Sequence, residues 1–480
     1  MRLTFNSLQN LFVAFLSLVA VADNQAWGQA YKDIVGYTRL RNEVGIGLAD
    51  GTGISVALAE ANAGPGLYFP DLTNPEFTGK TFTDASGSST VGPNGHTTEV
   101  ASRFFGNSSS FAPGVKIIQV YDAADFVFVK QGLNLNTTPT VVTTQSVMNH
   151  SYRGDFSSAT SAQQSNARLD FTIARDNFTS VVALGNLSDT QNVTGRLPSL
   201  YGQSYNSIVV GRSDGNHSSG ATDVGVLGRV KPDIVAPETS TSNATPLVSS
   251  AAAMLHQAAN SFGPNARNSV AMKSIIMAGA TKDSIPTWSN TSTRPLDSTY
   301  GAGQLNVYSS YRILEAGETN GVTSVTLPNP AVNSGLQGWD YGASITPGSP
   351  LLWNFNVAEG QSISEASILL TWNAQYKDVN GFFNSTLSLA NMDLKLFRLG
   401  AEIAASSSLI DNVEHIYLKN LSSGLYTISV SSDLDTSFGL AWNITAVPEP
   451  SSIACLCVVS LFGYTRVYRL RRTKKNLLTC

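Results

Sequence analysis

Cysteine is absent from most of this 480-residue chain. The three cysteines, Cys455, Cys457 and Cys480, all lie within the last twenty-six residues. The body of the protein therefore has neither a disulfide bond nor a thiol nucleophile, and its fold depends on a hydrophobic core. Hydrophobic residues make up 42% of the chain, which is enough for a large domain and a smaller second one.

Two other absences exclude whole classes of function. The sequence has no group of histidine, cysteine and carboxylate residues at the spacing of a metal site, so we expect no catalytic metal and no other cofactor. The presence of a structural calcium ion stays an open alternative, for which the sequence identifies no ligands. Without residues 1–30 and 447–480 the chain keeps 23 basic and 32 acidic residues, a net charge of −9. This acidic body, with no basic patch, argues against a nucleic-acid partner and favours an exported, soluble domain.

The first thirty residues have the pattern of a secretory signal peptide. Arg2 is followed by an apolar run over residues 11–21, which is too short for a stable membrane-spanning helix, and then by small residues. Cleavage after Ala22 and cleavage after Ala30 both fit this pattern. The sequence therefore predicts export and assigns residues 1–30 to the signal segment.

The other end of the chain has a second sorting pattern. Residues 447–475 comprise a polar break at Pro448–Pro450, an apolar stretch of about a dozen residues and a basic cluster. This order resembles the PEP-CTERM signal of exported bacterial proteins. The resemblance implies a sorting protease of the exosortase type as a partner, transient membrane anchoring, and a final place at the cell surface or in the extracellular matrix of a bacterium. A permanent single-pass anchor is the alternative, and the short apolar stretch argues against it.

The part between the two ends divides into two patterns. Residues 31–320 alternate short apolar runs with helix-like segments, which predicts an α/β domain with a mostly parallel sheet. Residues 340–446 alternate apolar and polar positions between glycine, serine and asparagine turns, which predicts an antiparallel β-sandwich. In the first domain the strand candidates are "GISVALAE", "VKIIQVYD", "SVMNHS", "TSVVALGN", "NSIVVGRS" and "KPDIVAP", and the helix candidates are 162–177, 242–260 and 264–281.

Four stretches of the first domain carry the groups that a serine hydrolase needs. Such an enzyme requires a hydroxyl nucleophile, a base, an acid that orients the base, and donors for the oxyanion. The stretches are "GTGISVALAE", which ends at Glu60, "PNGHTTEVASRFFG", which contains His96, "SVVALGNLSD", which contains Asn186, and "KPDIVAPETSTSNATP", which contains Ser242. In this order they resemble the subtilisin-like serine peptidases, the subtilase family, over residues 31–318.

The resemblance implies a three-layer subtilisin-like α/β fold and a role for each residue. Ser242 is then the nucleophile at a helix N-terminus, with His96 as its general base. Glu60 orients His96, and Asn186 donates to the oxyanion. Taken alone, Ser242 is an ordinary helix N-cap and Gly185-Asn186 an ordinary turn, so the assignment depends on the four stretches together.

Three features depart from the family pattern. Glu60 stands where the family has aspartate. Its extra methylene moves the carboxylate by more than about 1 Å, and a misplacement on that scale can cost about a hundredfold in rate. Asp50 lies before the strand and is a poor substitute. Ser240 replaces a glycine, and the segment before the first strand is too short for a propeptide.

The sequence therefore supports two functions. The first is an exported serine endopeptidase that hydrolyses peptide bonds of protein or peptide substrates through an acyl-enzyme on Ser242. The alternative is a catalytically impaired pseudoprotease that acts as a cell-surface or matrix binding protein, with the β domain as an adhesion module.

Overall fold

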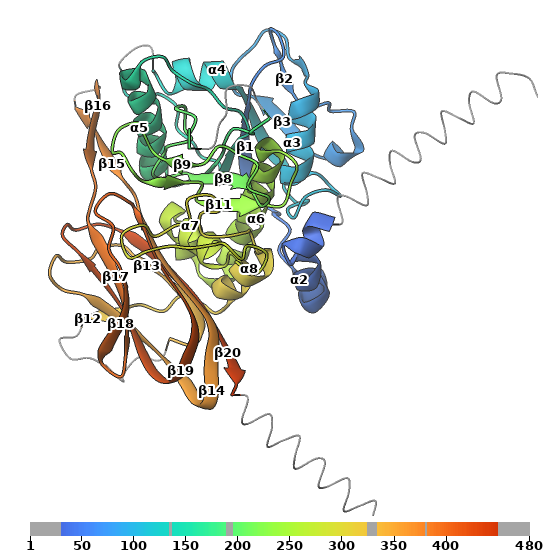
Figure 1. The fold of residues 1–480 in the computed structure, drawn as a ribbon. Coiled ribbons are helices and arrows are strands. Elements are labelled where there is room, and N and C mark those ends of the chain that lie inside the picture. The colour runs from blue at the N-terminus through green and yellow to red at the C-terminus, as the bar shows by residue number, and fades with distance from the viewer. Residues whose placement is uncertain (1–29, 134–136, 189–194, 324–333, 380–381, 450–480) are drawn as a thin grey trace, which may run out of the picture.

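The computed structural model describes residues 30–133, 137–188, 195–323, 334–379 and 382–449 (Figure 1). Residues 1–29 of the expected signal segment and residues 450–480 of the expected sorting segment lie outside the described residues. Among the residues that are described, no helix is both long and apolar enough to cross a membrane.

A seven-stranded parallel sheet forms the centre of the first domain, as the sequence predicted. Its order is β11-β8-β7-β6-β1-β5-β3. Six strands match the six candidates, and the seventh, β3, was missed because it is a four-residue edge strand with alternating exposure. The bounds are β1 Ser55–Glu60, β3 Thr81–Asp84, β5 Ile117–Asp122, β6 Val147–His150, β7 Thr179–Ala183, β8 Ile208–Arg212 and β11 Ile234–Ala236.

Helices cover both faces of this sheet and complete a three-layer fold (Figure 1). Along β1, Val56 and Leu58 face the core that contains α3 and α6, whereas Ala57 and Ala59 face the core that contains α5. This alternation follows from the two-residue period of a strand. The helices are α2 Tyr37–Val44, α3 Gly95–Phe105, α4 Ala123–Asp125, α5 Ala159–Asp176, α6 Thr241–Phe262, α7 Ser269–Ala278 and α8 Val307–Glu315. Short strand pairs complete the domain: β2 Leu67–Phe69 with β4 Gly92–Pro93, and β9 Gly220–Ala221 with β10 Val230–Lys231.

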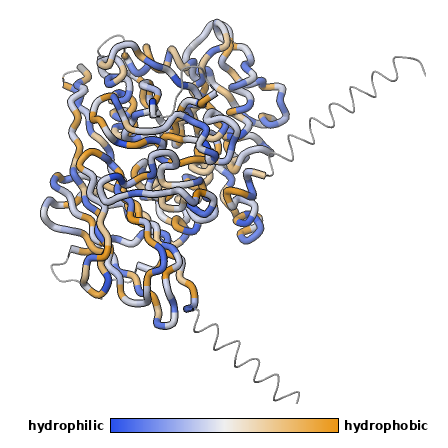
Figure 2. Tube along the Cα trace, viewed as in Figure 1, coloured by the Kyte–Doolittle hydropathy of each residue, from blue (hydrophilic) through white to orange (hydrophobic). Residues whose placement is uncertain are grey.

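The antiparallel β domain predicted for the second half is confirmed. Its strands form one hydrogen-bonded sheet in the order β13-β20-β14-β19-β17-β18, and β12 pairs with β14. The sheet stays continuous because the long strands β14 and β19 remain paired across a register shift between Val357 and Ser362. Figure 2 shows hydrophobic and hydrophilic residues interspersed along these strands. Their bounds are β12 Val322–Thr323, β13 Gln337–Gly342, β14 Leu351–Trp372, β17 Met392–Arg398, β18 Ala401–Ser406, β19 Val413–Ser432 and β20 Phe438–Pro448.

The β domain is docked firmly on helices of the first domain. A side chain at Gly439 of β20 would meet the carbonyl oxygen of Val270 in α7 at 2.4 Å, so the backbones are in direct contact. Thr371 Oγ1 donates to the same carbonyl at 2.7 Å. Trp339 of β13 is fully buried in the core of the first domain, against Gly263. The two domains therefore share part of one core.

A hairpin extends from the β domain to the far side of the first domain. It consists of β15 Gln375–Val379 and β16 Phe382–Ser388, and it packs on α5 (Figure 1). The rings of Phe383 and Phe171 lie 5.7 Å apart, and the guanidinium of Arg168 lies 4.5 Å from the ring centre of Phe383. The β domain thus contacts the first domain on two helical layers.

Candidate active site

Glu60 and His96 are brought together at the carboxyl end of the parallel sheet. This is the edge at which open α/β sheets bind their ligands. Glu60 is the last residue of β1 and is fully buried, and its Oε2 lies 2.9 Å from Nδ1 of His96. The side chain of His96 is 43% exposed, so part of the imidazole ring is open to solvent. The carboxylate of Glu60 therefore reaches the imidazole of His96.

Asn94 fixes the backbone on both sides of this pair. It is the N-cap of α3, and its Oδ1 accepts the backbone N–H of His96 at 2.9 Å. Its Nδ2 donates to the carbonyl of Ala61, the residue after Glu60, at 3.1 Å. One buried amide therefore ties the end of β1 to the first turn of α3. Asn94 was not identified from the sequence, although an asparagine two positions before a helical histidine is an N-cap signal.

The electrostatics of the pair suit a general base held by an acid. The hydrogen bond with Glu60 raises the pKa of His96 above its ordinary value, and partial burial opposes this effect. Burial raises the pKa of Glu60, and the hydrogen bond with His96 opposes that shift. With Glu60 ionised and the imidazole proton on Nδ1, Nε2 is left as the acceptor that a nucleophile needs.

Ser242 is the second residue of α6, close to the positive end of the helix dipole. Only residues 237–240 separate β11 from this helix. Ser240 is the N-cap, and its Oγ accepts the N–H of Asn243 at 3.2 Å. The backbone of Ser240 is extended, with φ −142° and ψ 155°, so this position does not require the glycine of the family pattern.

The hydroxyl of Ser242 contacts a neighbouring serine in this structure. Its Oγ lies 3.2 Å from Oγ of Ser240, and within the described part of the chain it makes no hydrogen bond with His96. Hydrogen bonds of catalytic groups are often long in the absence of substrate and shorten in the bound complex. A Ser–His pair would require the Ser242 hydroxyl to leave Ser240 and to come within hydrogen-bonding distance of His96 Nε2.

Asn186 follows β7, and its side-chain amide is oriented by the residue before Ser242. Its Oδ1 accepts the backbone N–H of Thr241 at 2.8 Å. Because Oδ1 is the acceptor in this contact, Nδ2 is the donor atom of this amide. An oxyanion site would take the backbone N–H of Ser242 as its second donor. Thr241 was not identified from the sequence, since threonine is common at the start of helices and its presence there carries no functional signal.

Comparison with known proteins identifies the family of the chain. The sequence model of the subtilase family matches residues 51–303. The chain belongs to the subtilase family. Among solved structures, the prenylagaramide maturation protease PagA is 20% identical, with a TM-score of 0.36, over 59% of this chain and 99% of that one. A cold-adapted subtilisin-like serine proteinase is 18% identical, with a TM-score of 0.35, over 54% and 90%. The protease domain of PatA is 21% identical, with a TM-score of 0.33, over 57% and 99%. No curated protein matches the chain.

The subtilase domain also has a buried polar link between its sheet and α6. Asn149 of β6 is fully buried, and its Oδ1 accepts from the hydroxyl of Ser249 in α6 at 2.9 Å. Its Nδ2 donates to the hydroxyl of Ser151 at 2.9 Å. The link fixes α6, which carries Ser242, against the strand next to β1. This role could not be assigned from the sequence, because the partners are 100 residues apart.

Other titratable residues of the subtilase domain do not compete with Glu60 and His96. Asp50 binds Thr52 in the turn before β1, about 17 Å of strand away from the end that carries Glu60. The three other histidines of this domain are buried, and burial lowers the pKa of His150 and His256 to about 3 and that of His217 to about 4, so they are neutral near pH 7. His415 of the β domain is also buried, and burial lowers its pKa well below its ordinary value. Across the described ranges, no three histidine, cysteine or acidic residues are grouped so as to hold a metal ion.

Proposed function

We propose that this subtilase is an exported serine endopeptidase that hydrolyses peptide bonds through an acyl-enzyme on Ser242. The observation that carries the proposal is the 2.9 Å contact between Glu60 Oε2 and His96 Nδ1. This contact supports Glu60 as the acid that orients His96. Among the four candidate site residues, Glu60 is the one that departs from the residue of the family pattern. Family membership supports a protein or peptide as the substrate.

In the proposed reaction Ser242 Oγ attacks the scissile carbonyl, and His96 Nε2 accepts the hydroxyl proton. Glu60 stays ionised and stabilises the imidazolium through Nδ1. The developing oxyanion accepts hydrogen bonds from Asn186 Nδ2 and the backbone N–H of Ser242, and loss of one such donor costs about 3–4 kcal/mol of transition-state stabilisation. His96 then protonates the leaving amine, and a water molecule activated by His96 releases the acyl group from Ser242.

Export and sorting are part of the same proposal. Residues 1–30 act as a signal peptide, and residues 447–475 are removed by a sorting protease of the exosortase type. The enzyme then works at the cell surface or in the extracellular matrix of a bacterium. Mass spectrometry of the natural protein tests this assignment, since mature protein that keeps both ends contradicts it.

A peptidase assay tests the catalytic proposal. Purified protein is incubated with a mixed peptide library, and cleavage is followed by mass spectrometry beside the variants Ser242→Ala and His96→Ala. We expect cleavage by the natural protein and a loss of at least about a thousandfold in both variants. Cleavage that survives in Ser242→Ala contradicts the assignment of the nucleophile.

The second candidate function is a pseudoprotease that binds peptides or surface polymer. The observation that favours it is the contact of Ser242 Oγ with Ser240 rather than with His96. The variant Ser240→Gly removes that contact and restores the residue of the family pattern. The pseudoprotease hypothesis is supported if the natural protein cleaves peptides at a very low rate and Ser240→Gly raises that rate about tenfold or more. It is excluded if the natural protein is active and Ser240→Gly leaves its rate of cleavage unchanged.

A further inference from the structure

The two helices that carry His96 and Ser242 come from distant parts of the sequence. His96 lies in the first turn of α3 and Ser242 in the first turn of α6, and the two helices pack against each other. The described structure contains no hydrogen bond between the two side chains. Their separation in the free protein is therefore set by contacts elsewhere along α3 and in the turn before α6.

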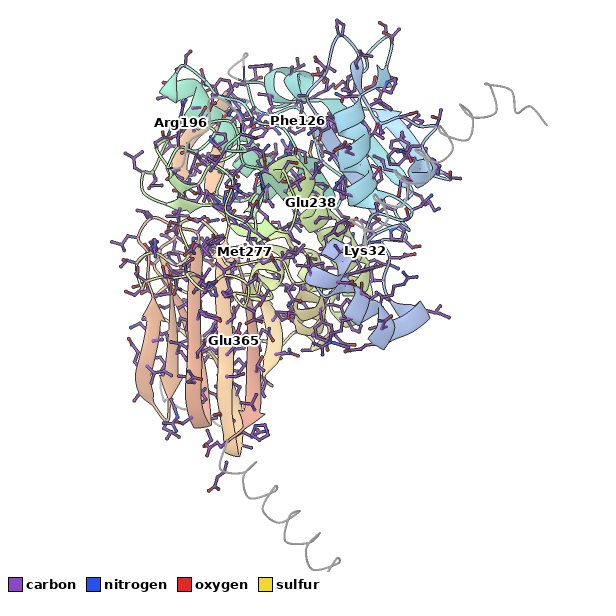
Figure 3. All side chains as sticks on the ribbon, turned by 45° about the vertical axis from the view of Figure 1, so that its right-hand side comes forward. Lys32, Phe126, Arg196, Glu238, Met277 and Glu365 are labelled. Carbon is purple, nitrogen blue, oxygen red and sulfur yellow. The ribbon has the colours of Figure 1, made fainter. Side chains whose placement is uncertain are left out.

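One ion pair joins those two segments directly. Arg103 Nε donates to Glu238 Oε1 at 2.7 Å. Both side chains are largely buried, with 24% of Arg103 and 8% of Glu238 exposed. Figure 3 labels Glu238 among the helices of the first domain. A pair with this burial is less screened than an exposed one and holds a more defined geometry.

Both partners are also fixed within their own segments. Arg103 Nη1 donates to the carbonyl of Glu99 at 3.3 Å, one turn earlier in α3. Glu238 Oε2 accepts the backbone N–H of Thr239 at 3.3 Å, within the turn that leads to Ser242. The pair therefore connects two backbones and not merely two flexible side chains.

Neither Arg103 nor Glu238 is close enough to His96 and Ser242 along its segment to contact the reacting atoms. Arg103 is seven residues after His96, which is about 10 Å along the helix axis. Glu238 comes four residues before Ser242 in a connection of only four residues between β11 and α6. A movement of this short connection is transmitted directly to the first turn of α6.

We propose that the ion pair of Arg103 and Glu238 is a positioning device that sets the distance between His96 and Ser242. The inference rests on the proposed serine peptidase function. A displacement of about 1 Å between a base and its nucleophile costs about a hundredfold in rate, so an anchor on this connection affects catalysis more than substrate binding.

A charge-reversal series tests the proposal by kinetics. In Arg103→Met and Glu238→Met we expect kcat to fall about 10- to 100-fold with KM changed less than about twofold. The double variant falls no further than either single one, because both remove the same contact. The reversed pair, Arg103→Glu with Glu238→Arg, recovers at least part of kcat. The matched control is Lys395→Met, which breaks the exposed pair with Glu402 at 3.1 Å in the β domain and leaves kcat unchanged.

Two outcomes overturn the inference. The first is a kcat within about twofold of the natural protein in both single variants, with only the unfolding temperature lowered, since the pair is then merely structural. The second is a crystal structure of Glu238→Met in which the separation of His96 and Ser242 is unchanged. The crystal structure does not depend on activity. If the natural protein cleaves no peptide, the proposed function is refuted, and the structure of the variant still decides whether the ion pair sets the separation of His96 and Ser242.

Discussion

Shortening the acid by one methylene is the most informative perturbation of the site. In Glu60→Asp the carboxylate retreats by about 1.5 Å, which lengthens the present 2.9 Å contact with His96 Nδ1 to roughly 4 Å, beyond hydrogen-bonding distance. The backbone cannot advance to compensate, because β1 is paired on both sides, with β5 and β6. The first turn of α3 cannot advance either, because Asn94 ties it to Ala61.

We therefore expect Glu60→Asp to lower kcat about a hundredfold, although it restores the residue of the family pattern. Glu60→Gln is the matched comparison, since it keeps the length of the side chain but removes the charge that stabilises the imidazolium. The assay is initial-rate hydrolysis of one good peptide substrate, with circular dichroism to verify that each variant is folded. A rise in rate in Glu60→Asp would refute the reasoning, because it would mean that the natural glutamate misplaces the base.

The pH dependence and the shared core provide three further predictions. Activity is lost as the pH falls through the pKa of His96, because a protonated imidazole accepts no proton. Since Glu60 raises this pKa, the midpoint of the loss of activity lies above the ordinary histidine value of about 6.5. A pH–rate profile will show this midpoint, and we expect it to move to lower pH in Glu60→Gln. Lys282 is buried at the domain junction, where burial lowers its pKa to about 7. Between about pH 7 and pH 10.4 the Lys282 side chain is protonated in the unfolded chain and neutral in the folded one, so the free energy of unfolding rises with pH over that window. We expect Lys282→Met to raise the melting temperature at pH 7 and to weaken this dependence of stability on pH. Equal melting temperatures of the variant and the natural protein contradict the reasoning. Trp339→Ala removes a fully buried ring from the core that the domains share and lowers the free energy of unfolding by about 3–5 kcal/mol. Urea denaturation measures it, and a loss below about 1 kcal/mol contradicts the shared core.

The local parts of this structure could be predicted from the sequence. Six strands of the parallel sheet correspond to short apolar runs that lie between turn residues. The alanine-rich segment after Ser242 has the composition of a buried helix. Glu60 could be placed at a strand end for the same reason. The edge strand β3 could not be predicted, since its four residues alternate between exposed and half-buried positions without an apolar run.

The remaining features depend on contacts between distant residues. The sequence does not reveal that Glu60 reaches His96, because the separation of a carboxylate and an imidazole is set by the pairing of β1 and the start of α3. Arg103 and Glu238 lie in two of the quoted stretches, but they are 135 positions apart, and nothing in either stretch indicates that their side chains pair. The docking of the β domain was also missed, since Gly439 looks like an ordinary glycine until α7 is placed against it.

The most direct test of the central claim is covalent labelling of the active serine. The purified protein is incubated with a fluorophosphonate probe at pH 8, and the site of labelling is mapped by peptide mass spectrometry, with Ser242→Ala and His96→Ala as controls. The account predicts one adduct, on Ser242, that is absent from the first variant and strongly slowed in the second. An adduct on another residue, or no adduct on the folded natural protein, would contradict the claim that Ser242 and His96 form a working catalytic pair.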